Sequence, residues 1–243
     1  MVMAEIPQFY LNLFGDNRSL RFLCADFGVG AFFYYFYQKR RKKMKLAEYD
    51  SVKNLNYLEY CDYLQKKYGI GLSDYMTKSW NKNTKVSRTK DGLLAHHKYE
   101  DHAIMLSSKE FAMQNPYEWQ LAKNIVYCDF LEHLFLHILI CENPAEDQNE
   151  FEAVGIGGVI NYIVPELNDL YSGWETGQAW RKNCHNLVIK DKDVYLTLLK
   201  RFKTSCKNYQ HYTDDCLYTS FNEQYGLWSK EKNQKLFEEI ALL

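Results

Sequence analysis

Five of the seven histidines of this 243-residue chain fall within one stretch, and their spacing could build a metal site. His96 and His97 are adjacent, and His133 and His137 follow, four residues apart. Side chains four apart share a helix face, so the second pair can chelate one ion. Adjacent strand residues face opposite sides, so one histidine of the first pair can reach that ion while the other lies beside the cleft. The pattern suggests a metal-dependent nuclease site, with three imidazole ligands and one imidazole as a base.

The segments that carry these residues resemble the HNH nucleases, most closely the colicin-type branch with three histidine ligands. The resemblance covers about residues 91 to 142 and consists of DGLLAHHKYED, KNIVYC and DFLEHLFLH. It implies an α+β fold, in which a small ββα-metal finger is embedded in a mainly α-helical body. Members of the family often carry paired cysteines as a second zinc knuckle. This chain has none around the site, so packing must support the finger.

The resemblance also implies a role for each residue of the site. His96, His133 and His137 fall on the three metal ligands. His97 falls on the general base. Asn124, at the start of the second strand, falls on the asparagine that holds this base in its productive tautomer.

The chemistry implied is hydrolysis of nucleic-acid phosphodiester bonds, with DNA expected rather than RNA. His97, neutral near pH 7 because free imidazole has a pKa of about 6.5, would take a proton from water. The hydroxide would attack phosphorus, and the cation would stabilise the developing charge, leaving 5′-phosphate and 3′-hydroxyl ends. Three imidazoles favour one Zn²⁺ or Ni²⁺ over Mg²⁺, which prefers oxygen ligands.

Two alternatives stay open at this point. The excursion from 98 to 123 is hard to align with the family, so Glu100, Asp101 or His102 could enter the site in place of a named residue. The histidines could also hold a structural zinc in a non-catalytic binding protein, and such sites tend to be closed by four protein ligands.

Local patterns place the site residues on elements. The runs 92–99 and 124–128 are predicted strands, and apolar residues on helical spacing follow from Asp129 to Cys141. Asp129 is the expected N-cap, with Glu132 completing a capping box. Between the strands we expect a short helix over 109–114, capped by Ser107 or Ser108, and another from Pro116 to about Lys123.

The rest of the chain is predicted to be mainly helical. One helix is expected over 54–68, ended by Gly69, and further helices near 158–171, 174–184, 191–206 and 229–242. Gly155, Gly157 and Gly158 are interpreted as turn and close-packing positions, because they lack the context of a nucleotide-binding loop. The expected regions are 1–43, an N-terminal extension that the working protein does not need; 44–90, helical with a basic loop; 91–142, HNH-like; and 150–243, helical.

Composition limits the partners. The net charge is −1, so a surface for nucleic acid must be local. The segment 77–91 is rich in Lys and Arg and could grip phosphates or be an ordinary solvated loop. Seven scattered cysteines without a Cys-x-x-Cys pair predict reduced thiols and a cytoplasmic protein. No protein partner can be named.

The N-terminal run 22–37 is apolar and aromatic, and a basic run follows it. It falls short of the roughly 20 apolar residues that a spanning helix needs, and Asp26 interrupts it. A packed amphipathic element is the favoured interpretation over a membrane anchor.

Overall fold

The computed structural model describes residues 44–148, 152–209, 211–224 and 230–243, which lie in one compact unit that starts at Lys43. The predicted extension 1–43, with its apolar run, lies outside the described residues. Within the described ranges, none of the helices has both the length and the apolar character that crossing a membrane takes. The three predicted regions from residue 44 onward all belong to this one unit.

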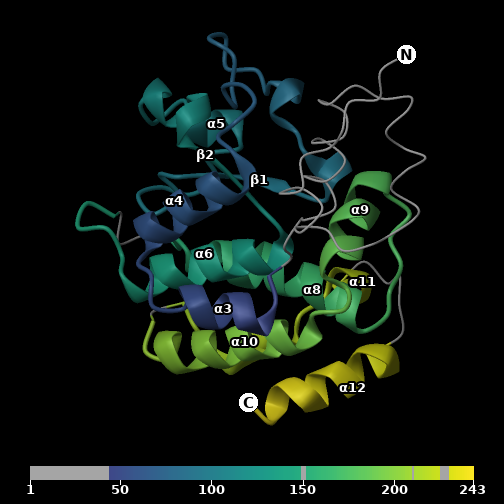
Figure 1. Cartoon of the computed structure of the whole chain (residues 1–243). Coiled ribbons are helices and arrows are strands. Elements are labelled where there is room, and N and C mark those ends of the chain that lie inside the picture. The colour runs from purple at the N-terminus through teal and green to yellow at the C-terminus, as the bar shows by residue number, and fades with distance from the viewer. Residues whose placement is uncertain (1–43, 149–151, 210, 225–229) are drawn as a thin grey trace, which may run out of the picture. The chain divides into compact units, whose positions relative to one another are not determined.

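The described chain is mainly helical and carries a small two-stranded sheet, which makes it α+β (Figure 1). The strands are β1 (Leu94–His97) and β2 (Ile125–Cys128). The α-helices are α3 (Leu46–Val52), α4 (Tyr57–Tyr68), α5 (Lys109–Ala112), α6 (Phe130–Glu142), α7 (Ile156–Gly158), α8 (Val164–Tyr171), α9 (Ala179–Val188), α10 (Lys192–Cys206), α11 (Phe221–Gln224) and α12 (Lys230–Ala241). A π-helix, Val159–Ile163, joins α7 to α8.

The two strands pair antiparallel, with His96 opposite Val126 and His97 opposite Ile125. Helix α6 begins one residue after the Asp129 that follows β2. The order of strand, excursion, strand and helix is therefore the predicted one. Both strands are shorter than predicted.

The excursion between the strands differs from the prediction. The expected helix over 109–114 is found as α5, but the expected helix from Pro116 to Lys123 is wrong. That segment forms two 3₁₀ turns, Tyr117–Gln120 and Ala122–Asn124. Leu121 between them has an extended backbone, with ψ 146°, so the turns cannot join into one α-helix.

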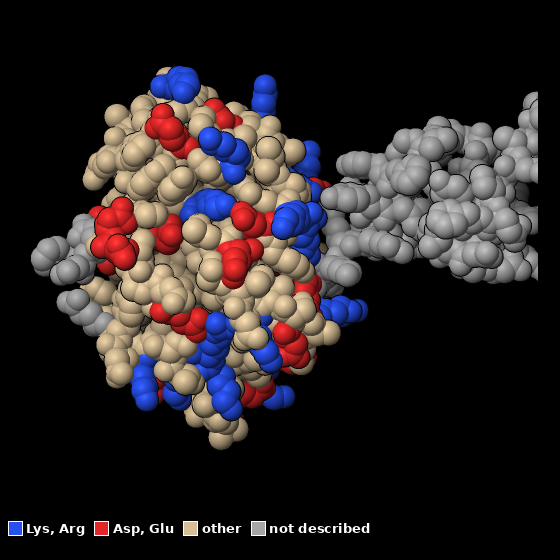
Figure 2. Space-filling model, turned by 60° about the vertical axis from the view of Figure 1, so that its left-hand side comes forward, with Lys and Arg blue, Asp and Glu red and all other residues tan. Residues whose placement is uncertain are grey.

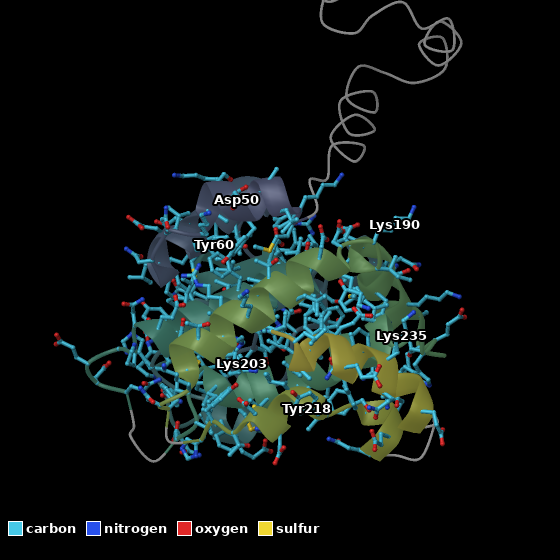
Figure 3. All side chains as sticks on the ribbon, turned by 90° about the horizontal axis from the view of Figure 1, so that it is seen from below. Asp50, Tyr60, Lys190, Lys203, Tyr218 and Lys235 are labelled. Carbon is cyan, nitrogen blue, oxygen red and sulfur yellow. The ribbon has the colours of Figure 1, made fainter. Side chains whose placement is uncertain are left out.

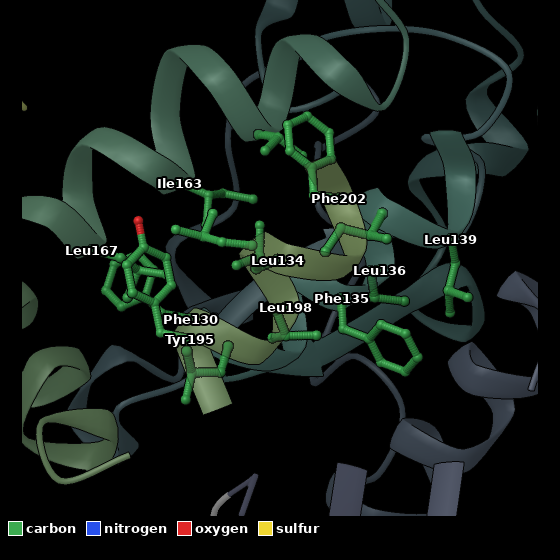
Figure 4. Packing of buried hydrophobic residues seen from close by; sticks show 14 of the residues in the cluster. Phe130, Leu134, Phe135, Leu136, Leu139, Ile163, Leu167, Tyr195, Leu198 and Phe202 are labelled. Carbon is green, nitrogen blue, oxygen red and sulfur yellow. The ribbon is translucent and has the colours of Figure 1, made fainter. Parts of the chain in front are cut away.

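Helix α6 lies at the centre of the core (Figure 4). It is apolar on almost every side, which is the pattern of a helix covered all round. It packs against α4, α9, α10, the sheet and the π-helix. Seen from below in Figure 3, α10, which carries Lys203, and α12, which carries Lys235, form this side of the molecule.

The start of α6 is fixed by the predicted capping box, which is confirmed. Asp129 Oδ1 accepts from Glu132 N at 2.8 Å, and Glu132 Oε2 accepts from Asp129 N at 2.8 Å. Glu132 is fully buried, and its Oε1 accepts from Lys67 Nζ at 2.6 Å and from the Tyr68 hydroxyl at 3.1 Å. These contacts hold the first turn of α6 against α4, and this turn carries His133.

Candidate metal centre

His133 and His137 lie one turn apart on α6, and the predicted spacing brings their rings together. Their Nε2 atoms are 3.2 Å apart. Two nitrogens bound to one tetrahedral Zn²⁺ at bond lengths of about 2.0–2.1 Å would lie about 3.3 Å apart. His133 Nδ1 is buried and has no hydrogen-bond partner among the described residues. The pair therefore has the spacing of two ligands that share an ion.

Strand β1 brings His96 to the same point from a remote part of the chain. Its ring centroid lies 5.2 Å from those of His133 and His137. Its Nε2 is 2.8 Å from the Tyr57 hydroxyl of α4, and this hydroxyl donates to the carbonyl of His97 at 3.3 Å. A hydroxyl has a single proton, so when Tyr57 donates it to that carbonyl its oxygen can accept from the Nε2–H of His96. The lone pair of His96 Nδ1 then faces the cluster, as a ligand requires.

Glu100 is the fourth member of the cluster and lies in the turn after β1. Its Oε2 is 3.1 Å from His96 Nδ1 and 3.4 Å from His137 Nε2. One donor atom from each of the four residues lies within 4.8 Å of the others. The four could therefore hold one metal ion. Glu100 is one of the residues that the sequence left open as an alternative for the site.

Burial lowers the pKa of two histidines of the cluster, His96 and His133, and so favours their neutral form. Burial lowers the pKa of His96, against the opposing effect of Glu100. Burial, followed by the nearby His137 and His96, places the pKa of His133 well below its ordinary value. Burial alone would raise the pKa of Glu100, but the imidazoles outweigh it, His96 first, and that pKa lies well below its usual range. Neutral imidazoles and a charged carboxylate are the forms that bind a cation.

Two glycines fix the ring of His137. The carbonyl of Gly155 lies 3.0 Å from His137 Nδ1, and a proton on Nδ1 leaves the Nε2 lone pair for an ion. Gly155 has φ +72°, a conformation that favours glycine. A Cβ at Gly158 would lie 2.5 Å from His137 Nδ1, so only glycine lets the backbone come this close. The prediction of turn and close-packing positions is confirmed for these two.

His97 lies on the other side of Glu100 and is fully buried. Its Nδ1 is 3.1 Å from Glu100 Oε1, and its Nε2 is 3.2 Å from Gln120 Oε1. Gln120 Nε2 donates to the carbonyl of Leu106, which turns the amide oxygen toward His97. Both ring nitrogens of His97 therefore face acceptor oxygens. This arrangement suits a ring whose Nδ1–H donates to Glu100 Oε1. The role of His97 as a base stays a prediction.

Asn124 is buried near the sheet, but the structure does not bring its side chain to His97. Its Nδ2 donates to the carbonyl of Glu118 at 2.7 Å, and its own carbonyl accepts from Lys98 N at 2.8 Å. Gln120 occupies the place beside His97 that the resemblance gave to the asparagine. No pattern in the sequence points to Gln120, because it lies in the unaligned excursion.

His102 and Asp101 remain outside the cluster. His102 Nδ1 is 2.6 Å from Asp147 Oδ1, and its ring lies against Trp119 and Tyr99. Trp119 and Tyr99 are stacked on each other, with ring centroids 5.0 Å apart. His102 is thus a loop residue, as the sequence favoured.

A cavity of about 690 Å³ lies against the cluster, and Glu100, His133 and His137 form part of its wall. Lys82 and Arg88, from the basic segment 77–91, also line it. Two hydrogen-bond donors of Arg88 are already used, because Nε donates to Asp91 and Nη1 donates to the carbonyl of Tyr68. The remaining lining is largely apolar. The candidate metal site can therefore be reached by a molecule in the cavity, which Lys82 also lines.

Comparisons with family models, with curated proteins and with solved structures gave no match to this chain.

Proposed function

We propose that the protein is a metal-dependent endonuclease of the HNH type, which hydrolyses phosphodiester bonds of nucleic acid, DNA rather than RNA. The observation that carries the proposal is the convergence of His96, His133, His137 and Glu100, of which the last three line a cavity. Imidazole ligands favour Zn²⁺ or Ni²⁺ over Mg²⁺. Such an ion supplies charge stabilisation at a phosphate oxygen when it is bound.

Hydrolysis also needs a base that can reach water in the cavity. Glu100 lines the cavity, whereas His97 reaches it only through Glu100 Oε1. In the proposal, Glu100 binds the ion through Oε2, and His97, which contacts Glu100 Oε1, keeps the base role that the family resemblance gives it. Glu100 as the base, without a place among the ligands, is the alternative within the same reaction.

A structural zinc site is the second candidate, and Glu100 is the specific observation that favours it. A site with three imidazoles and one carboxylate has four protein ligands, which is the number typical of a closed structural site. The protein would then be a binding protein without catalytic activity. Access from the cavity favours the enzyme, whereas ligand number favours the structural site.

Plasmid nicking separates the two. Protein stripped of metal is incubated with supercoiled DNA and with Zn²⁺, Ni²⁺, Mn²⁺ or Mg²⁺ added singly. The proposal expects the wild type to nick the plasmid and His133→Ala to lose this activity. His102→Ala should retain it, because His102 lies outside the cluster. His97→Ala should lose cleavage while it still binds the metal, whereas Glu100→Gln should also bind the metal more weakly, because Glu100 belongs to the cluster and His97 does not.

The opposite outcome is equally clear. No nicking of the plasmid and no cleavage of single-stranded DNA with any of the four metals, together with unfolding of the wild-type protein when a chelator is added, would establish the structural zinc site instead.

A further inference from the structure

One wall of the cavity is a π-helix, Val159–Ile163, which begins directly after Gly158. Gly158 lies against the ring of His137, so this wall is attached to the metal cluster. Asn161 and Tyr162 of the π-helix line the cavity, and 55% of Tyr162 is exposed. Short π-helical segments occur frequently at functional sites, where they displace side chains from regular helical positions.

Two further large apolar side chains line the same cavity and are exposed. Trp180, in the first turn of α9, is 42% exposed, and Met105 is 41% exposed. Met105 also has φ +52°, a left-handed backbone that is uncommon outside glycine. Exposed apolar side chains gathered at one cavity mark a ligand site rather than ordinary surface. The two aromatic rings among them offer faces for stacking.

The polar part of the lining contains groups suited to a phosphate and a sugar. The hydroxyls of Ser87 and Thr89 lie 3.1 Å apart, and both residues line the cavity together with Lys82. His133 and His137 of the metal cluster line the same cavity. The cavity thus combines a cation site and phosphate donors with aromatic faces.

The size of the cavity limits what can enter. Its volume of about 690 Å³ is in the range of pockets for single small molecules. A paired base can reach such a pocket only when its nucleotide is extruded from the duplex. On the face that Figure 2 shows, acidic and basic side chains are interspersed, so that face offers no continuous basic surface for a duplex backbone.

We propose that the cavity takes one unpaired nucleotide unit, with its phosphate at the metal cluster and its base against Tyr162 and Trp180. The substrate would then be single-stranded DNA, or an unpaired end or flap, in preference to an intact duplex. This inference rests on the proposed nuclease function for the reaction, but the binding of a nucleotide can be measured without any cleavage.

The test measures binding to the full-length protein loaded with Zn²⁺. Calorimetry compares thymidine 5′-monophosphate, deoxyribose 5-phosphate and inorganic phosphate. Stacking on aromatic rings should make the nucleotide bind about 5- to 100-fold more tightly than the sugar phosphate. Trp180→Ala and Tyr162→Ala should each reduce this difference. Trp119→Ala should retain it, because Trp119 lines a different cavity.

Equal affinity for nucleotide and sugar phosphate, or unchanged affinity in both cavity variants, would overturn the inference. A second experiment compares cleavage of one labelled oligonucleotide as a single strand and as a duplex, and equal rates would also overturn it. Base-dependent binding without cleavage in any divalent metal would reject the proposed nuclease while leaving the nucleotide pocket in place.

Discussion

Gly158 lies so close to the ring of His137 that any side chain at this position would overlap the imidazole. The two residues are far apart in sequence, yet the backbone of one sets the position of a candidate ligand on the other. The contact gives a way to displace one ligand without changing any ligand residue.

Gly158→Ala should weaken metal binding, because the new Cβ pushes the His137 ring away from the cluster. Loss of an outer contact that positions a ligand typically reduces metal affinity by about 10- to 100-fold. Gly157→Ala is the matched control, since a Cβ there meets Ala153 Cβ only at 3.3 Å. Competition with a fluorescent zinc chelator measures both variants. Equal affinities for the two would show that the Gly158 contact does not position the ligand.

Tyr57→Phe should weaken metal binding by a similar factor for a different reason. The variant removes the hydroxyl that accepts from His96 Nε2, so the tautomer with a free Nδ1 lone pair loses its support. The control is Tyr63→Phe on the same helix, whose hydroxyl donates to Glu48 instead. The same chelator competition applies. If Tyr63→Phe lowers affinity as much as Tyr57→Phe, the effect comes from α4 as a whole.

Metal binding should persist at mildly acidic pH. Free imidazole with a pKa of about 6.5 is about nine-tenths protonated one pH unit lower, which weakens binding about tenfold for each imidazole ligand. Burial lowers the pKa of His96 and that of His133, so protons compete less for these nitrogens. We expect affinity to fall by much less than about a thousandfold between about pH 7.5 and 5.5. A drop of that full size would mean that the imidazoles titrate like free histidine.

Glu132→Gln should change the pH dependence of stability. Burial, followed by the nearby Asp129, raises the pKa of Glu132 to about 8, against the opposing effect of Lys67. A carboxyl with a raised folded-state pKa gives stability that is present below its unfolded pKa and is lost as pH rises toward the folded value. Between about pH 5 and 8, the free energy of unfolding of the wild type should therefore fall relative to that of Glu132→Gln, which has no carboxyl group to titrate at this position.

Glu142→Gln provides the control for this measurement. Burial alone would raise the pKa of Glu142, but hydrogen bonds from Arg201 and Ser205 lower it below its ordinary value. Glu142 is thus charged throughout that pH window, and its variant should show a constant difference from the wild type. Urea denaturation at several pH values measures all three proteins. A constant difference for Glu132→Gln as well would contradict the raised pKa.

Lys67→Met should destabilise the fold by about 1–3 kcal/mol, because it leaves two buried carboxyl groups without their shared hydrogen-bond donor. Lys67 Nζ contacts both Glu48 and Glu132. Lys53→Met is the control, since Lys53 pairs with Asp50 on the surface, where an ion pair contributes about 0–1 kcal/mol. Urea denaturation at neutral pH gives both values. Similar losses for the two lysines would show that the α4–α6 ion pair is not buried in solution.

The parts of the site that were predictable are those fixed by local chemistry. Asp129 and Glu132 are a capping pair three residues apart, and His133 and His137 are a helical pair four apart, so short-range spacing determines both. The convergence of His96 with these residues follows the strand–strand–helix order that the resemblance implied. In each case the signal lies within a few residues or in the order of elements.

The parts that were missed depend on contacts between distant segments. Gln120 reaches His97 from an irregular excursion whose turns are held by single hydrogen bonds, and no periodic pattern marks it. Glu100 was one of several neighbours with suitable chemistry, and only the turn after β1 decides which one points inward. The contact of Tyr57 with His96 joins two elements 39 residues apart.

Two candidate ligands, His96 and His137, are also attached to other segments through their outer ring nitrogens. Tyr57 belongs to α4, His96 to β1, His137 to α6, and Gly155 to the turn before α7. An ion coordinated here would act as a cross-link that closes long loops of the chain, much as a disulfide does. Amides across α4, the sheet and α6 should then exchange with deuterium as one cooperative group when Zn²⁺ is bound.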